Sequence, residues 1–159
     1  MKADWTPDDS LFRTGLTGEL KGVELIKGAL KEVGVHFGKG IVTSQDPGMQ
    51  AAFKALERDV DLDGVQQWLL PIAFTPPEGV PVLWLISRLE ANSSVPEHSH
   101  INAHFRMVIE GSCTINGVEL GVSDWVSVPA GVSYGMQTGP QACIWTYPHP
   151  MPPMTGLTG

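Results

Sequence analysis

The sequence predicts an all-β fold, an antiparallel β-barrel of the jelly-roll type preceded by a helical and irregular N-terminal extension. From about residue 59 onward, short apolar runs alternate with turn residues, as in barrels and sandwiches of short strands. The 159 residues include 18 glycines and 13 prolines, which are dispersed rather than periodic and so indicate many tight turns. A chain of this length suits one domain with a sizeable core.

Residues 1–58 are predicted to form an extension that packs on the barrel and covers one of its edges. Residues 1–18 lack a regular pattern and are expected to be an irregular arm. In residues 19–33, apolar side chains recur every three or four positions, which predicts an amphipathic helix. Two glycines inside this segment leave a pair of strands as the alternative. Residues 48–58 are predicted to form a second short helix.

The barrel itself is predicted to span residues 59–150 and to be followed by a tail over residues 151–159. Asn116-Gly117 is a strong hairpin signal because both residues readily adopt positive φ angles, and Glu110-Gly111 is a second expected turn. The predicted strands are residues 66–74, 81–90, 96–101, 104–109, 112–116, 124–128, 132–137 and 142–147.

Charge and composition narrow the expected partners and location. The formal net charge is −7, and an acidic surface disfavours nucleic acids and anionic membranes. The N-terminus has no apolar signal segment, and no apolar run is long enough to span a bilayer. Cys113 and Cys143 lie in apolar surroundings and are expected to be buried, reduced thiols. We therefore expect a cytoplasmic protein.

Three of the five histidines lie close together in the sequence. His98 and His100 have the alternate spacing that puts two side chains on one face of a strand. His104 opens the next predicted strand, so antiparallel pairing would bring all three imidazoles into the interior. Buried imidazoles need partners, and three converging ones predict a divalent metal site. His36 and His149 are isolated in the sequence and are expected at the surface.

The segment around these histidines resembles the first sequence motif of the cupin superfamily. In that motif HxH is followed by three or four residues, a glutamate, six residues and a glycine. Here His98 and His100 are followed by three residues, His104, six residues and Gly111. A histidine therefore stands at the position of the glutamate. Asn92 replaces the opening glycine, a mild change because asparagine also tolerates left-handed conformations.

A second segment resembles the second cupin motif, which is a glycine, five to seven residues, PxG, two residues and a histidine. Here Gly121 is followed by seven residues, Pro129-Ala130-Gly131, two residues and Tyr134. A tyrosine thus stands where the family has its last histidine ligand. The resemblance covers about residues 80–147. It implies a cupin fold, with one metal ion held by the three histidines and Tyr134 beside a fourth position.

Two further residues are candidates for catalysis. Tyr134 is expected to act as a proton donor or acceptor beside the metal, and the alternatives are direct ligation or packing in the core. Arg106 lies two residues after His104 on the same predicted strand and should share its inward face. A buried arginine needs an anionic partner. That partner is either a substrate carboxylate or Glu90 or Glu97, unless a different register leaves the arginine outside.

The resemblance implies a mononuclear metal-dependent enzyme that acts on a small oxygenated organic substrate, and the neutral three-histidine set favours an anionic one. An iron-dependent dioxygenase is the leading expectation, because three neutral histidines leave positions open for substrate and oxygen. A redox-neutral lyase, isomerase or cyclase is the close alternative, and a non-catalytic ligand sensor is a third. Iron is the expected metal, with zinc, manganese or nickel as alternatives. A homodimer is expected because cupin barrels commonly pair.

Overall fold

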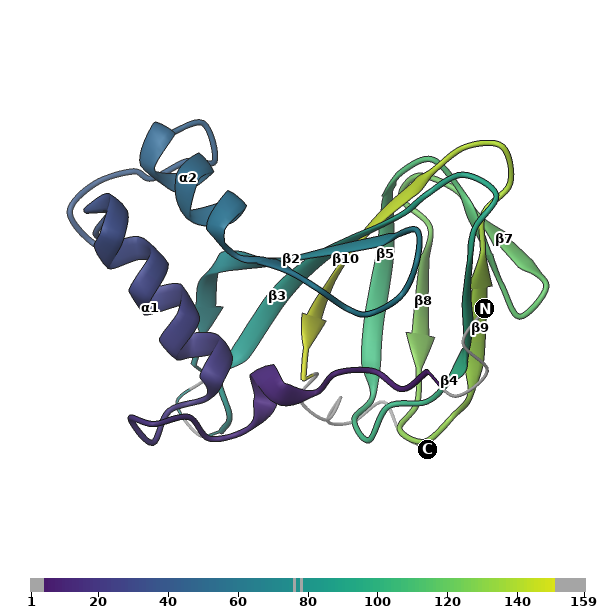
Figure 1. Cartoon of the computed structure of the whole chain (residues 1–159), viewed down its shortest axis with the longest axis horizontal. Helices are drawn as coiled ribbons and strands as arrows, with labels where there is room; N and C mark the ends of the chain where they lie inside the picture. Colours follow the sequence, from purple (N-terminus) through teal and green to yellow (C-terminus); the bar gives the residue numbers. More distant parts are fainter. Residues whose placement is uncertain (1–4, 76, 78, 151–159) are drawn as a thin grey trace.

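Two antiparallel sheets form the body of the protein (Figure 1). This computed structural model describes residues 5–75, 77 and 79–150. In order across the larger sheet, the strands are β1 (Glu57–Arg58), β2 (Val65–Phe74), β3 (Val82–Leu89), β10 (Cys143–His149), β5 (His104–Glu110) and β8 (Trp125–Val128). The smaller sheet contains β4 (Ser94–His98), β9 (Tyr134–Gln137), β6 (Cys113–Ile115) and β7 (Val118–Leu120). The predicted all-β fold class with a helical extension is confirmed.

Strand periodicity decides which side chains enter the core. In β5, buried and partly exposed residues alternate, so His104, Arg106 and Val108 face inward while Phe105 and Met107 face outward. The same alternation in β3 and β10 buries every second residue. Both sheets contribute to a single hydrophobic cluster, whose members include Leu69, Leu85, Val108 and Trp145 from the larger sheet and Val95, Ile115 and Met136 from the smaller one.

The N-terminal region forms two helices that stand beyond one end of the larger sheet (Figure 1). They are α1 (Lys21–Val33) and α2 (Pro47–Ala55), which confirms the helix predicted for residues 19–33 and excludes the alternative of two strands. Gly22, which made that prediction ambiguous, has a packing role: a Cβ there would lie 2.2 Å from Leu83 Cδ1. A larger residue at this position would therefore require the Leu83 side chain to move. Strand β1 also belongs to this region, and it pairs with β2 at one edge of the larger sheet.

Most predicted strands are present with small shifts in their ends, and Asn116 and Gly117 have the expected positive φ angles of 47° and 81°. The sequence analysis missed β1 and β7. It also placed the strand that contains His98 two to three residues too late: β4 ends at His98, so His100 follows the strand instead of lying on it. Cys113 and Cys143 are buried and free, as predicted.

None of the helices in the described part of the chain is both long enough and apolar enough to cross a bilayer. The tail predicted over residues 151–159 lies outside the described residues.

Candidate functional site

Five ring-bearing side chains meet at the end of the molecule where four strands begin or finish. His98 is the last residue of β4, and Tyr134, the first of β9, pairs with it in the register of the smaller sheet. His104 begins β5 and His149 ends β10. His100 comes from the short connection between β4 and β5. All three histidines predicted as metal ligands, and Tyr134, are thus brought together.

The spacing of the imidazoles suits a single metal ion. The ring centroids of His98 and His100 are 5.1 Å apart, and those of His100 and His104 are 4.6 Å apart. With metal–nitrogen bonds of about 2.1 Å, the centroids of two imidazoles on one ion lie ~4.6 Å apart at a right angle and ~5.3 Å apart at a tetrahedral angle. The donor chemistry of these histidines, and the separations of these two pairs of rings, are therefore compatible with one shared metal ion.

The hydroxyl group of Tyr134 stands where two of these imidazoles converge. It lies 3.1 Å from His104 Nε2 and 3.3 Å from His100 Nε2. Within residues 5–75, 77 and 79–150, no three His, Cys, Asp or Glu side chains stand in the geometry of a formed metal site. Metal binding by the three histidines therefore stays a prediction. For it to occur, the Nε2 atoms of His100 and His104 must bind the metal in place of the Tyr134 hydroxyl group.

Burial keeps His98 and His104 neutral at pH 7. It lowers the pKa of His98 to about 4 and that of His104 to about 2, and the positive charge of Arg106 acts in the same direction on both groups. His98 Nδ1 lies 2.8 Å from the carbonyl oxygen of Pro96, to which it can donate its proton. The lone pair is then on Nε2 of His98. A neutral imidazole with one nitrogen fixed as a donor is the form that binds metals.

Arg106 is buried in the same region and lies against aromatic rings. Its guanidinium carbon is 4.2 Å from the ring centroid of Tyr147 and 5.6 Å from that of Tyr134. The sequence analysis left Glu90 as a possible partner, but Glu90 pairs with Arg88 instead. Among the described residues no carboxylate forms an ion pair with Arg106, and its Nε atom is buried without a hydrogen-bond partner. The predicted inward orientation is confirmed, and the alternative of an ion pair with Glu90 or Glu97 is wrong.

His149 was expected at the surface, and this prediction is wrong: only 4 % of the residue is exposed. Its ring centroid lies 5.8 Å from that of His100 and 6.2 Å from that of His104. Burial lowers its pKa to about 4. The alternation along β10, which buries Cys143 and every second residue after it, was the signal that could have placed His149 inside. His36 is exposed, as predicted.

His98, His100, Arg106 and His149 line a cavity of about 70 Å³, whereas His104 and Tyr134 are not part of its lining. Its volume is far below the roughly 300–1,000 Å³ of sites for drug-sized ligands, so it suits a small molecule. One wall is polar: Gln67 Nε2 donates to Tyr147 Oη at 2.5 Å, and Arg58 Nη1 donates to Gln67 Oε1 at 2.5 Å. The other lining residues include Leu85, Val95, Met136, Trp145 and several residues of the N-terminal arm.

No protein-family model and no curated protein sequence matches this chain. Similar solved structures include the polyketide cyclase RemF from Streptomyces resistomycificus, with 24% identity, coverage of 55% of this chain and 65% of that chain, and a TM-score of 0.47. KdgF from Halomonas sp. has 16% identity and a TM-score of 0.46, and the match covers 61% of this chain and 87% of KdgF. A cupin superfamily protein from Desulfitobacterium hafniense has 14% identity, coverage of 62% and 86%, and a TM-score of 0.45.

The chain spans less than two thirds of the length of the cyclase. At these identities and TM-scores the similarities carry no information about activity. The description of the fold rests on the strand order and register of this chain.

Proposed function

We propose that this chain, which has a cupin-type fold, is a mononuclear metal-dependent enzyme that assists proton transfer on a small anionic, oxygenated substrate. The observation that supports this most is the grouping of unlike chemical groups in one small cavity. The imidazoles of His98 and His100 and the guanidinium of Arg106 line it, and the phenol of Tyr134 lies within hydrogen-bond distance of His100. Among the described residues this buried cation packs against aromatic rings and forms no ion pair with a carboxylate, and a substrate anion would supply the balancing charge.

In this proposal His98, His100 and His104 hold the metal. The bound ion would supply Lewis-acid chemistry by polarising an oxygen atom of the substrate. The three imidazoles bring no negative charge, so the site retains the full charge of the ion. That favours anionic or chelating substrates, such as a carboxylate beside a carbonyl group. The cavity restricts the substrate to a few heavy atoms beyond the group held at the histidines.

Arg106 is proposed to hold the carboxylate of the substrate. Its fork of N–H groups matches a carboxylate in bidentate geometry. The aromatic rings of Tyr147 and Trp145, whose centroids are 4.2 Å and 5.7 Å from its guanidinium carbon, fix the plane of the fork. Because the group is buried, a carboxylate paired with it would be shielded from water and held strongly.

Tyr134 is proposed to carry the proton. Burial raises the pKa of its phenol in the metal-free protein, so the group is protonated at neutral pH. Its oxygen atom already lies within hydrogen-bond distance of two imidazoles. From this position Tyr134 Oη can donate a proton to a substrate oxygen, and its phenolate can then accept the proton that leaves the neighbouring carbon, which is general acid and base action in a lyase, isomerase or cyclase.

Hydrogen–deuterium exchange tests this function without knowledge of the natural substrate. Small 2-oxo and 3-oxo carboxylates are incubated in D₂O with protein loaded with zinc, manganese, nickel or iron. Loss of the signal of the proton next to the carbonyl is followed by NMR. We expect at least one such compound to exchange faster with loaded protein than with metal-free protein. If none exchanges faster, proton transfer is the wrong chemistry for this site.

The iron-dependent dioxygenase expected from the sequence is the second candidate. It is favoured by the neutral three-imidazole set, in which no protein carboxylate occupies a position of the metal. Oxygen consumption separates the two functions: a dioxygenase takes up one O₂ per substrate with iron alone, whereas proton transfer proceeds under nitrogen and with zinc.

Replacing Tyr134 by phenylalanine should slow proton exchange by about 10²–10⁴-fold, the usual contribution of a general acid or base. The metal content should not change, because in this proposal the phenol is not a ligand. Exchange rates and elemental analysis of the same preparations give both quantities. A tenfold or greater loss of metal affinity would assign the phenolate to the metal, and an unchanged rate would leave Tyr134 as packing only.

Replacing Arg106 by leucine should weaken binding of small carboxylates by about tenfold to a hundredfold, because hydrogen bonds to charged groups contribute about 1.5–3 kcal/mol. Titration calorimetry with oxalate or a 2-oxo carboxylate measures this loss. Arg88→Leu is the matched control, since Arg88 is on the outward side of β3 and pairs with Glu90. Equal affinities in Arg106→Leu and wild type would rule out a carboxylate site at Arg106.

A further inference from the structure

The N-terminal arm, residues 5–12, contacts three of the four histidines at the site. Each contact joins a different residue of the arm to a different histidine. The pairs are Trp5 with His98 at 5.1 Å between ring centroids, Phe12 with His149 at 4.2 Å between ring centroids, and Asp9 Oδ1 with His100 Nδ1 at 4.0 Å. In Figure 1 the arm crosses from η1 (Ser10–Phe12) past the ends of β10 and β5 toward β4.

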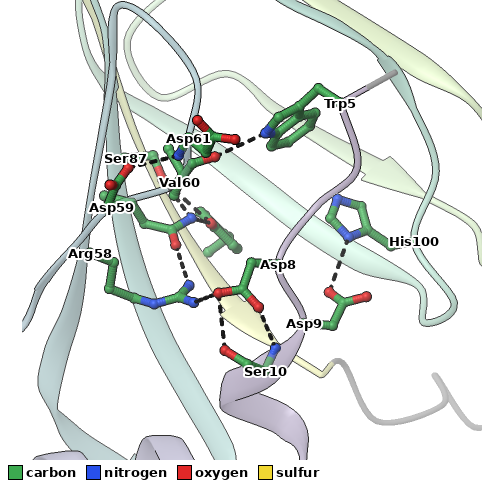
Figure 2. A network of polar contacts seen from close by, with 12 residues as sticks. Trp5, Asp8, Asp9, Ser10, Arg58, Asp59, Val60, Asp61, Ser87 and His100 are labelled. Carbon is green, nitrogen blue, oxygen red and sulfur yellow. Dashed lines mark hydrogen bonds and ion pairs between the residues drawn. The ribbon is translucent and has the colours of Figure 1, made fainter. Parts of the chain in front are cut away.

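Polar contacts hold the arm in this place. Trp5 Nε1 donates to the carbonyl oxygen of Val60 at 2.9 Å. Arg58 Nη2 donates to Asp8 Oδ2 at 2.9 Å, and the side chain of Arg58 is only 11% exposed. Figure 2 shows these contacts together with Asp9, whose carboxylate points to His100. The position of Asp9 is therefore determined by neighbours that do not belong to the histidine cluster.

The two ring nitrogens of His100 have different surroundings. Its Nε2 atom faces the site and lies 3.3 Å from the hydroxyl of Tyr134. Its Nδ1 atom is buried and has no hydrogen-bond partner among the described residues. The carboxylate of Asp9, at 4.0 Å, is the charged acceptor that faces this atom. A small rotation of the Asp9 side chain would bring its oxygen within hydrogen-bond distance, which is shorter than about 3.2 Å.

We propose that Asp9 is a positioning residue, which accepts the Nδ1 proton of His100 in a hydrogen bond and thereby keeps the lone pair of Nε2 directed into the site. A carboxylate behind an imidazole fixes the tautomer and the ring orientation and makes the other nitrogen a better donor to a metal. Asp9 lies in the irregular N-terminal extension, outside both segments that resemble cupin motifs. The arm is thus part of the site and not only a cover. The expected effect of Asp9 on metal affinity rests on the proposed function. Its expected effect on the tautomer of His100 does not.

Two measurements on Asp9→Ala test the inference. Long-range ¹H–¹⁵N NMR of the metal-free protein reports the tautomer of each histidine, with His100→Gln used to assign the signal. We expect the Nδ1–H tautomer of His100 in the wild type and a shift toward Nε2–H in Asp9→Ala. Competition titration with zinc should show a 10–100-fold loss of affinity in Asp9→Ala, the usual effect of removing a carboxylate behind a metal ligand.

Asp59→Ala is the matched control, because it removes an exposed carboxylate from the same region, and no contact joins it to a histidine among the described residues. It should leave both measurements unchanged. If His100 has the same tautomer in Asp9→Ala as in wild type, with both proteins folded by circular dichroism, Asp9 does not position the ring and the inference fails. If wild type binds no zinc, the proposed metal site fails, and the tautomer measurement still decides the role of Asp9.

Discussion

A protein carrying both His98→Ala and His104→Ala is expected to lose stoichiometric binding of a divalent metal. The three proposed ligands come from two strand ends and one connection, and the double variant keeps only His100 among them. Loss of a residue behind a ligand already costs about 10–100-fold in affinity, so loss of two ligands should cost far more. Elemental analysis after dialysis against a metal buffer measures the outcome.

The matched control is His36→Ala, because His36 is exposed and lies outside the cluster. This variant should keep one metal per chain if the wild type does. His149→Gln is informative in addition, since His149 borders the cluster without being a proposed ligand. One metal retained per chain in the double variant would show that the metal is bound elsewhere or that the ligand set is wrong.

The positions of most strands along the chain were predictable because the signals for them are local. Turn residues with positive φ, such as Asn116 and Gly117, mark the ends of strands without reference to the rest of the chain. Alternation along a strand likewise predicted that His104 and Arg106 share the inward face. Short strands with few apolar residues give weaker signals, which is why β1 and β7, of two and three residues, were missed.

Residues that reach the site from distant parts of the sequence were not predictable in this way. Asp9 and Phe12 lie in an arm with no periodic pattern, and they meet His100 and His149 only because the folded arm crosses the ends of the strands. His149 was misjudged for a related reason. It was considered as an isolated histidine near prolines, although it continues the inward alternation of β10 by one step beyond the predicted end of that strand.

For Arg106 the sequence predicted the direction of the side chain but not its neighbours. The period of a strand predicts the direction of the side chain, but the partner of a buried charge depends on which side chains other strands supply. In this protein they supply aromatic rings, those of Tyr134, Trp145 and Tyr147, in place of a carboxylate. This difference supports assigning the guanidinium to a substrate, and it could only be seen once the strands were placed together.

The metal-free protein is expected to lose several kcal/mol of its free energy of unfolding between pH 7 and pH 5. Burial lowers the pKa of His98 and His149 to about 4 and that of His104 to about 2, whereas an ordinary histidine has a pKa of 6.5. At pH values between the folded pKa and 6.5, the histidines of the unfolded chain bind protons that those of the folded protein do not. The stabilisation is therefore complete above about pH 6.5 and decreases as the pH falls toward the folded values.

Each of these histidines contributes a loss of about 2 kcal/mol between pH 7 and pH 5, since one pKa unit corresponds to about 1.4 kcal/mol. Their effects are not fully additive, because the rings lie against one another. Even so, the melting temperature should fall by about 10 °C or more over this interval. The interaction with His100 lowers the pKa of Asp9 below its ordinary 3.8. Protonation of this carboxyl therefore occurs below pH 5 and does not contribute to the loss of stability between pH 7 and pH 5.

Urea unfolding of the metal-free protein at half-unit steps from pH 7 to pH 5 gives the number of linked protons from the slope of stability against pH. His149→Gln should reduce that slope by close to one proton near pH 5.5, whatever its effect on stability at pH 7. His36→Ala should leave the slope unchanged, because His36 is exposed. A slope that stays flat in the wild type would mean that the cluster takes up protons in the folded state. The histidines would then be accessible to solvent, and neither the metal-binding nor the positioning role described above could rely on their being neutral.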